Sequence, residues 1–196
     1  MKELFMSKVL GNLILQTFLA YNSAKYVMDN QEVEDSVLRN QLFIAISSLA
    51  ILLVLIFARL GTPIKFVLFT IFSTLIGALL SSVKTMDREK VKEALAATVG
   101  IFVVMFVAGL LSTRLKIDFV PIALALFVIY LVTLFATLLR YNTSKIFVPI
   151  FALFVLVETN IMMRKNYQGD FVNGSLSYFT DIVNLFTNLL QSMNND

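Results

Sequence analysis

Long apolar runs separated by short polar turns make up almost the whole chain. Seven of the runs have about 18–21 residues, enough for an α-helix to cross about 30 Å of hydrocarbon. We expect membrane-spanning helices at about residues 9–28, 41–58, 64–83, 94–112, 119–139, 145–163 and 174–192. The polar stretch at residues 29–40 is the longest between them, and we interpret it as a loop. The pattern therefore predicts an all-α integral membrane protein with one membrane domain, residues 1–196.

The seventh run differs from the others because it carries a regular polar stripe. Its polar side chains recur at spacings of 4, 3, 4 and 3, which places them on one helical face: Ser177, Asp181, Asn184, Asn188 and Gln191. Hydrocarbon cannot satisfy such groups, so the stripe predicts either the wall of an aqueous cavity or a helix at the centre of the bundle. The alternative is an amphipathic helix lying flat on the membrane, although the stripe lacks the Lys and Arg that such helices favour.

Two acids lie inside the last two apolar runs. Glu158 stands about five residues before the end of the sixth run, and Asp181 about seven residues after the start of the seventh. Consecutive runs are antiparallel, so the two depths match to within about 3 Å and the carboxyl groups can face each other. Such a pair shares a proton in a low dielectric, and when both groups are ionised it offers oxygen ligands suited to Ca²⁺. The alternative for Glu158 is a carboxylate that reaches out to the headgroups.

Arg59 ends the second run, just before the turn that contains Gly61 and Pro63. It is a candidate latch that pairs with an ionised acid if its helix is adjacent to the acids. A snorkelling arginine at a helix end is the alternative. Lys and Arg are evenly divided between the two sides of seven crossings, so their distribution does not orient the chain.

Composition narrows the chemistry further. Apolar residues make up 58% of the 196 and charged residues 15%, and there is no Cys and no His. Disulfides, thiolate metal sites and imidazole chemistry are therefore excluded, which leaves proton chemistry to carboxyl groups. The formal net charge of +3 is spread over the loops and does not indicate nucleic-acid binding. No P-loop, GxSxG or GxGD element occurs, so we expect no enzyme activity and no cofactor.

The stretch SLSYFTDIVNLFTNLL at Ser175–Leu190 resembles the signature of the Bax inhibitor-1 family, also called the transmembrane BAX inhibitor motif or lifeguard family. Members typically read A-L-S-L-Y-L-D-I-I-N-L-F, which aligns Asp181 with the family aspartate. Upstream, Glu158-Thr159-Asn160 stands in the place of the family's D-T-Q or D-L-N element, with a longer acid. Weaker similarity extends over FMSKVLGNLILQTF and over the fourth run with its exit TRLKIDF.

The resemblance implies seven helices with the last one central. It also implies a pH-sensitive calcium leak channel and, in eukaryotes or their viruses, suppression of cell death. Glu158 and Asp181 would then form the pH-sensing pair and a transient Ca²⁺ site on the ion pathway. Arg59 would be the latch of the closed state.

Three hypotheses follow. The first is a calcium leak gated by the carboxyl pair, and the second is a non-conducting regulator that binds partner membrane proteins. The third is a proton-coupled cation exchanger. We expect a monomer whose partners are the lipid bilayer, Ca²⁺ and H⁺, without nucleic acid. Its membrane would be the endoplasmic reticulum or Golgi in a eukaryotic or viral setting and the plasma membrane in a bacterial one.

Overall fold

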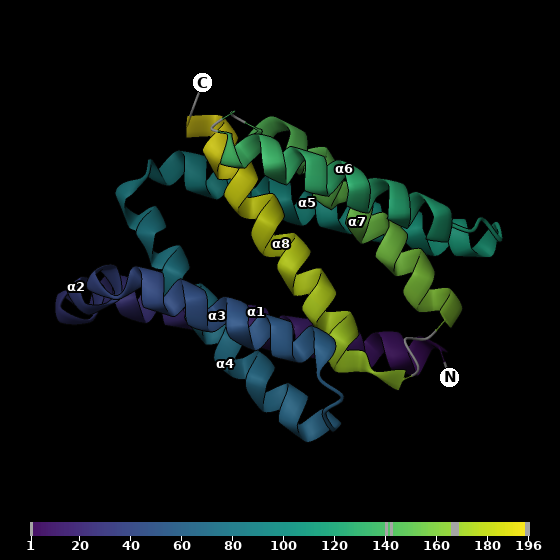
Figure 1. Cartoon of the computed structure of the whole chain (residues 1–196), viewed down its shortest axis with the longest axis horizontal. Helices are drawn as coiled ribbons and strands as arrows, with labels where there is room; N and C mark the ends of the chain where they lie inside the picture. The colour runs from purple at the N-terminus through teal and green to yellow at the C-terminus, as the bar shows by residue number, and fades with distance from the viewer. Residues whose placement is uncertain (1, 140, 142, 166–168, 195–196) are drawn as a thin grey trace. The chain divides into compact units, whose positions relative to one another are not determined.

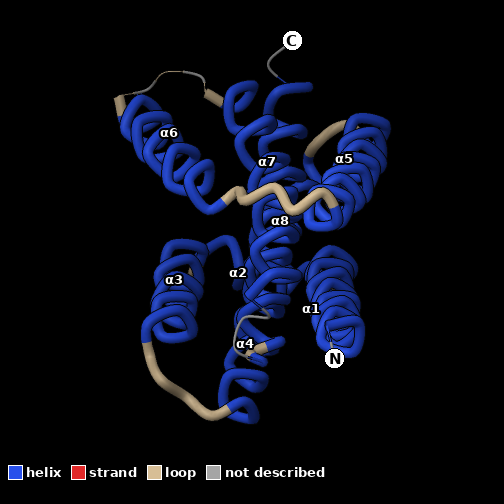
Figure 2. Tube along the Cα trace, turned by 90° about the vertical axis from the view of Figure 1, so that its right-hand side faces the viewer, coloured by secondary structure: helices blue, strands red, loops and turns tan. Residues whose placement is uncertain are grey.

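The computed structural model describes residues 2–139, 141, 143–165 and 169–194, and all of its regular elements are helices (Figure 1). No strand occurs within these ranges, and loops join the helices (Figure 2). In chain order the elements are α1 (Lys2–Asp29), α2 (Gln31–Arg39), α3 (Gln41–Phe57), α4 (Thr62–Leu80), the 3-10 helix η1 (Ser81–Thr85), α5 (Arg88–Arg114), α6 (Val120–Leu138), α7 (Ser144–Lys165) and α8 (Phe171–Asn194). The predicted all-α class is confirmed.

Among the described residues, five helical stretches are long and apolar enough to cross a membrane: Glu3–Asp29, Thr62–Thr85, Arg88–Arg114, Val120–Leu138 and Ser144–Arg164. A sixth is present if α2 and α3, which meet at a bend of 73°, count as one broken span. Large apolar side chains such as Leu42, Leu124 and Phe135 are largely exposed along these helices. Side chains of this kind need lipid around them, and the chain is an integral membrane protein.

The predicted count of seven spans is not confirmed. The missing one is α8, which contains the whole predicted segment 174–192 as helix but is not among the five apolar stretches. Its polar stripe is the reason, because repeated Asn, Ser and Gln side chains lower the mean hydropathy of the helix. The place of α8 at the centre of a bundle likewise stays a prediction.

The interpretation of residues 29–40 as a loop is wrong, since α2 occupies most of that stretch. Its sequence QEVEDSVLR places Val33 and Val37 one turn apart on a mostly polar helix. Acids in its first turn and Arg39 in its last complement the helix dipole. Other helices also begin before their apolar runs, and α5 starts at Arg88 instead of residue 94, because helical hydrogen bonding continues through the polar flanks.

The helices fall into two compact units. The first contains α1, α2, α3, α4 and η1 together with residues 170–176, and the second contains α5, α6, α7 and α8 from Ser177 onward. Whether both belong to one membrane domain stays a prediction.

Within the first unit, α3 packs against α4, and α1 meets α4 closely enough to bring their backbones together. A Cβ atom on Gly77 of α4 would collide with the carbonyl group of Ala20 on α1, so only glycine fits there. Beside this contact, Gln16 is fully buried and its Oε1 accepts a hydrogen bond from Ser73 Oγ at 2.7 Å. Small residues and side-chain amides thus join these helices, as is usual where lipid surrounds the bundle.

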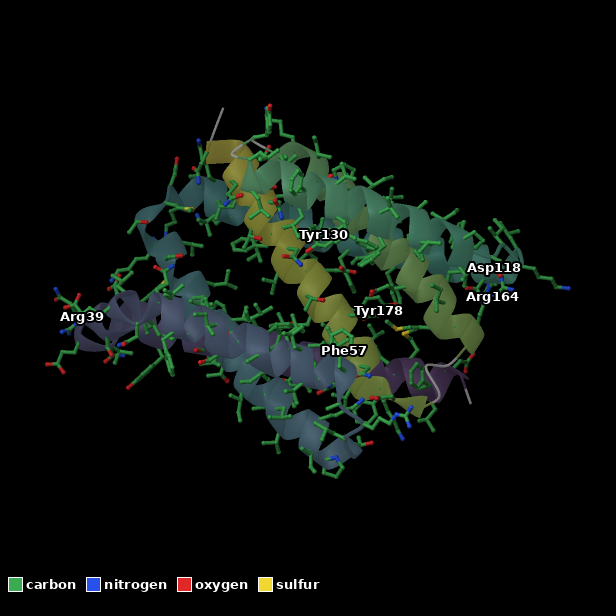
Figure 3. The ribbon with its side chains drawn as sticks, viewed as in Figure 1. Arg39, Phe57, Asp118, Tyr130, Arg164 and Tyr178 are labelled. Carbon is green, nitrogen blue, oxygen red and sulfur yellow. The ribbon has the colours of Figure 1, made fainter. Side chains whose placement is uncertain are left out.

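Within the second unit, α7 packs against both α5 and α6. The ring of Tyr130 on α6, labelled in Figure 3, lies edge-on to Phe151 and Phe154 of α7, with ring centroids 5.8 and 6.2 Å apart. On the α5 side, Gly109 lies so near α7 that an added Cβ would be 2.6 Å from Thr159 Cβ. These contacts hold α7 in place at the level of its polar residues Glu158, Thr159 and Asn160.

Candidate functional site: a carboxyl pair on the last two helices

The structure brings Glu158 and Asp181 together within the second unit. Glu158 lies on α7 and Asp181 on α8, and their carboxyl groups are within hydrogen-bonding reach of each other. Ser177, one turn before Asp181 on α8, also reaches the Glu158 carboxyl group. Depth matching of the two antiparallel helices in the sequence pairs these same two acids, and the role of the pair as a pH sensor and ion site stays a prediction.

One oxygen of each carboxyl group lacks a hydrogen-bond partner. Asp181 is 5% exposed and Glu158 is half-buried. Glu158 Oε2 and Asp181 Oδ2 are both buried without a partner among the described residues. Leaving a buried polar atom unpaired costs about 1–3 kcal/mol, and more when it is charged. A bound proton, a cation or water would relieve this cost, so the pair has the chemistry of a site that takes up H⁺ or a hard cation.

The described residues add few metal ligands to the pair. No group of three or more His, Cys, Asp or Glu side chains that would hold a metal occurs among the residues that the structure describes. Two carboxyl groups and the Ser177 hydroxyl supply fewer oxygens than the six to eight that Ca²⁺ takes, so water would complete the shell. Such a site suits a cation in transit better than a stored one.

The remaining members of the stripe are arranged along α8 toward its C-terminal end. Gln191 Oε1 accepts a hydrogen bond from Ser144 Oγ at the start of α7, at 3.0 Å. Asn188 Nδ2 donates to the carbonyl of Asn184 on its own helix, at 2.8 Å. The stripe thus begins beside the carboxyl pair and ends in a contact with α7, and its last member serves helix packing.

The description of one protein family fits the whole chain. The sequence model of the family described as inhibitor of apoptosis-promoting Bax1 matches residues 2–196. The chain belongs to this Bax inhibitor-1 family. No curated protein matches the sequence. Membership confirms the resemblance drawn from residues 158–160 and 175–190, and it suggests an anti-apoptotic membrane protein.

In this Bax inhibitor-1 protein, the element Glu158-Thr159-Asn160 makes contacts in three directions. Glu158 meets Asp181, and the Thr159 hydroxyl lies 2.6 Å from the hydroxyl of Tyr178 on α8. Asn160 is fully buried, and its Nδ2 donates to Ser112 Oγ at 2.9 Å near the end of α5. Each residue of the element therefore joins α7 to a neighbouring helix.

The turn that leaves α5 is held by the same part of α7. The carbonyl of Ile117 accepts hydrogen bonds from Asn160 Nδ2 at 3.0 Å and from Arg164 Nη1 at 2.9 Å. Arg164 also lies 3.7 Å from the carboxylate of Asp118, and both side chains are labelled in Figure 3. Sequence reasoning did not find this cluster, although Asn160 within an apolar run was a signal for it.

Arg59 lies in the first unit of this family member, in the connection between α3 and α4, with an exposed side chain. Its role as a latch stays a prediction. The first unit has a different buried cation, since Lys65 on α4 is 7% exposed and its Nζ lies 2.6 Å from Asp170 Oδ2. Asp170 Oδ1 also accepts the backbone N–H of Asn173, at 3.1 Å, and so caps α8. An acid four residues before the predicted run at 174–192 was the sequence signal for this cap.

Proposed function

We propose that this Bax inhibitor-1 protein is a pH-sensitive calcium leak channel in which the Glu158–Asp181 pair controls the ion pathway. The proposal includes seven crossings with α8 central, no enzyme activity and no resident cofactor. Ca²⁺, H⁺ and the surrounding lipid are its partners. The observation that carries it is the approach of two carboxyl groups on antiparallel helices, each with one buried oxygen that no described residue satisfies.

The charge state of the pair gives the direction of the pH response. With one proton, the two carboxyl groups share it and hold α7 and α8 together. With none, two negative charges repel each other in a low dielectric and present free oxygen ligands to a cation. Ca²⁺ also competes with protons for the same oxygens. Both effects favour conduction at higher pH, so we expect the leak to increase as the pH rises. A latch between Arg59 and an ionised acid would give the opposite pH dependence, so the same measurement tests that latch.

Purified protein in calcium-loaded liposomes tests the proposal. The efflux rate should rise by up to about tenfold per pH unit below the midpoint of the titration, because the ionised fraction of the carboxyl pair rises by that factor there. Asp181→Asn and Glu158→Gln should each remove the pH response. Asp118→Asn is the matched control, since Asp118 is an acid of the same unit that is bonded to Arg164 and lies outside the pair. Efflux with an unchanged pH profile in both pair variants would contradict the mechanism.

A non-conducting regulator is the second candidate function. It is favoured by the Gln191–Ser144 hydrogen bond, which uses part of the stripe for helix packing instead of lining a cavity. It predicts no calcium efflux at any pH together with a membrane protein that co-purifies. A third candidate, an exchanger, predicts saturable transport with a fixed ratio of protons to cations, which a passive leak does not have.

A further inference from the structure

A second polar contact joins α7 to α8 directly beside the carboxyl pair. The hydroxyl oxygens of Thr159 and Tyr178 are 2.6 Å apart, and neither residue is exposed. The Thr159 hydroxyl also donates to the carbonyl of Val155 at 2.7 Å. Either hydroxyl can donate in the contact between them, since each carries one hydrogen and two acceptor lone pairs. The contact links Tyr178 through Thr159 to the α7 backbone.

Both ends of this contact are fixed by α5. The Tyr178 ring meets Phe102 and Phe106 edge-on, with centroids 5.4 and 6.1 Å away and ring planes at 88° and 74°. Behind Thr159, Gly109 leaves no space for a further atom, since an added Cβ would be 2.6 Å from Thr159 Cβ. The hydrogen bond thus lies between two supported side chains and cannot lengthen without disturbing the packing of α5.

The position of the contact relates it to the acids. Thr159 directly follows Glu158, and Tyr178 follows Ser177, which reaches the Glu158 carboxyl group. Tyr178 also precedes Asp181 by three residues, about 4.5 Å along the helix axis. A hydrogen bond at this point fixes how far α7 and α8 can slide or separate at the level of the acids.

We propose that Tyr178 and Thr159 are positioning residues that hold Glu158 and Asp181 at the separation at which they share a proton. This inference rests on the proposed function, because it concerns the same pair. Loss of the Tyr178–Thr159 hydrogen bond lets the carboxyl groups move apart, weakens their interaction and brings their two titration steps closer together.

On the described helices of the second unit, the other charged side chains stand at or near the helix ends. Those of α5 lie in its first two turns, within 88–93, and at Arg114, which is about 7.5 Å along the axis from Gly109. Helix α6 has none between Val120 and Leu138. On α7, Lys145 lies at the start, and Arg164 follows Glu158 by about 9 Å of helix. Tyr178 itself is the nearest other titratable side chain on α8.

Infrared spectroscopy of the reconstituted full chain tests the proposal. The bands of protonated carboxyl groups are followed from acid to alkaline pH and assigned with Glu158→Gln and Asp181→Asn. We expect Tyr178→Phe and Thr159→Val each to narrow the separation of the two steps by about half a pH unit or more, which corresponds to a threefold weaker interaction. Thr159→Ser keeps the hydroxyl and should restore the normal separation.

Thr98→Val is the matched control, because Thr98 is a buried threonine whose hydroxyl donates to the Ala94 carbonyl of its own helix, at 2.7 Å. This variant should leave both titration steps of the carboxyl pair unchanged. Titration steps of Tyr178→Phe and Thr159→Val that coincide with those of the unchanged protein would overturn the proposal. So would a narrowing of the same size in Thr98→Val.

The calcium efflux measurement separates this inference from the proposed function. If the unchanged protein shows no efflux while the infrared steps narrow in Tyr178→Phe, the leak is refuted and the positioning role stands. If efflux follows pH normally in every variant and the steps do not move, the leak stands and the positioning role is refuted.

Discussion

The ion pair between Lys65 and Asp170 gives a sharp prediction, because its two members are unequally buried. The side chain of Lys65 is 9% exposed and that of Asp170 is 27% exposed, with 2.6 Å between Nζ and Oδ2. Removing the acid leaves an ammonium group without a partner and nearly without water. Removing the lysine leaves a carboxylate that water still reaches and that still accepts the N–H of Asn173. We therefore expect Asp170→Asn to cost more free energy of unfolding than Lys65→Met.

The expected magnitudes follow from these surroundings. Breaking a buried ion pair by removing one partner costs about 3–5 kcal/mol, and the lower end applies here because one side is partly exposed. Asparagine caps a helix about as well as aspartate, so Asp170→Asn removes the negative charge and keeps the cap. It should lower the free energy of unfolding by about 3 kcal/mol. Lys65→Met should cost about 1–2 kcal/mol. The double variant has no buried charge left and should lie within about 1 kcal/mol of the unchanged protein, which makes the coupling energy about 3 kcal/mol.

A double-mutant cycle in detergent micelles measures this coupling, with helical circular dichroism followed through a denaturant titration. Asp170→Ala adds the loss of the cap and should cost about 1 kcal/mol more than Asp170→Asn. The reasoning would be refuted if Lys65→Met were the more costly single change. A coupling energy below about 0.5 kcal/mol, the value typical of an exposed pair, would refute it too.

Two further predictions concern packing and surface charge. Gly77→Ala should destabilise the protein by about 1–3 kcal/mol, because the added Cβ meets the Ala20 carbonyl. Gly11→Ala should stabilise it by up to about 1 kcal/mol, since nothing lies within 4 Å of a Cβ at that site. Thermal unfolding of both variants in one detergent compares them, and equal shifts of the unfolding temperature would contradict the α1–α4 contact. Asp118→Asn should change the free energy of unfolding by less than about 0.5 kcal/mol, because the ion pair with Arg164 is exposed and 3.7 Å long. If the denaturant titration gave a decrease in this free energy of more than about 1 kcal/mol, the ion pair would be stronger than its exposure implies.

The sequence was most informative where a pattern repeats along one helix. Apolar run lengths located every long helix, and the spacing of polar residues on α8 identified the face on which Asp181 lies. The depths of Glu158 and Asp181 could be compared because α7 and α8 are consecutive and antiparallel. Both inferences need only the geometry of a single helix or of two neighbours in the chain.

Contacts between distant segments could not be predicted in this way. Lys65 and Asp170 are separated by 105 positions, and neither residue indicates the other. Nothing in the sequence distinguishes Gly109 from other small residues of its helix, and only the structure shows that Thr159 occupies the space beside it. The helix α2 was missed for a different reason: its charged residues resemble a loop, while its stability depends on where those charges stand along a helix dipole.

The three consecutive residues Glu158, Thr159 and Asn160 have a consequence for how α7 can move. Successive residues of an α-helix point about 100° apart, so their contacts extend around more than half of its circumference. Helix α5 holds Asn160 through Ser112, and α8 holds Thr159 through Tyr178. Turning α7 about its own axis by even one residue would break these buried hydrogen bonds at once. Within the second unit, these hydrogen bonds therefore prevent α7 from rotating about its own axis. A conformational change that separates Glu158 from Asp181 has to be carried by tilting or sliding of α8.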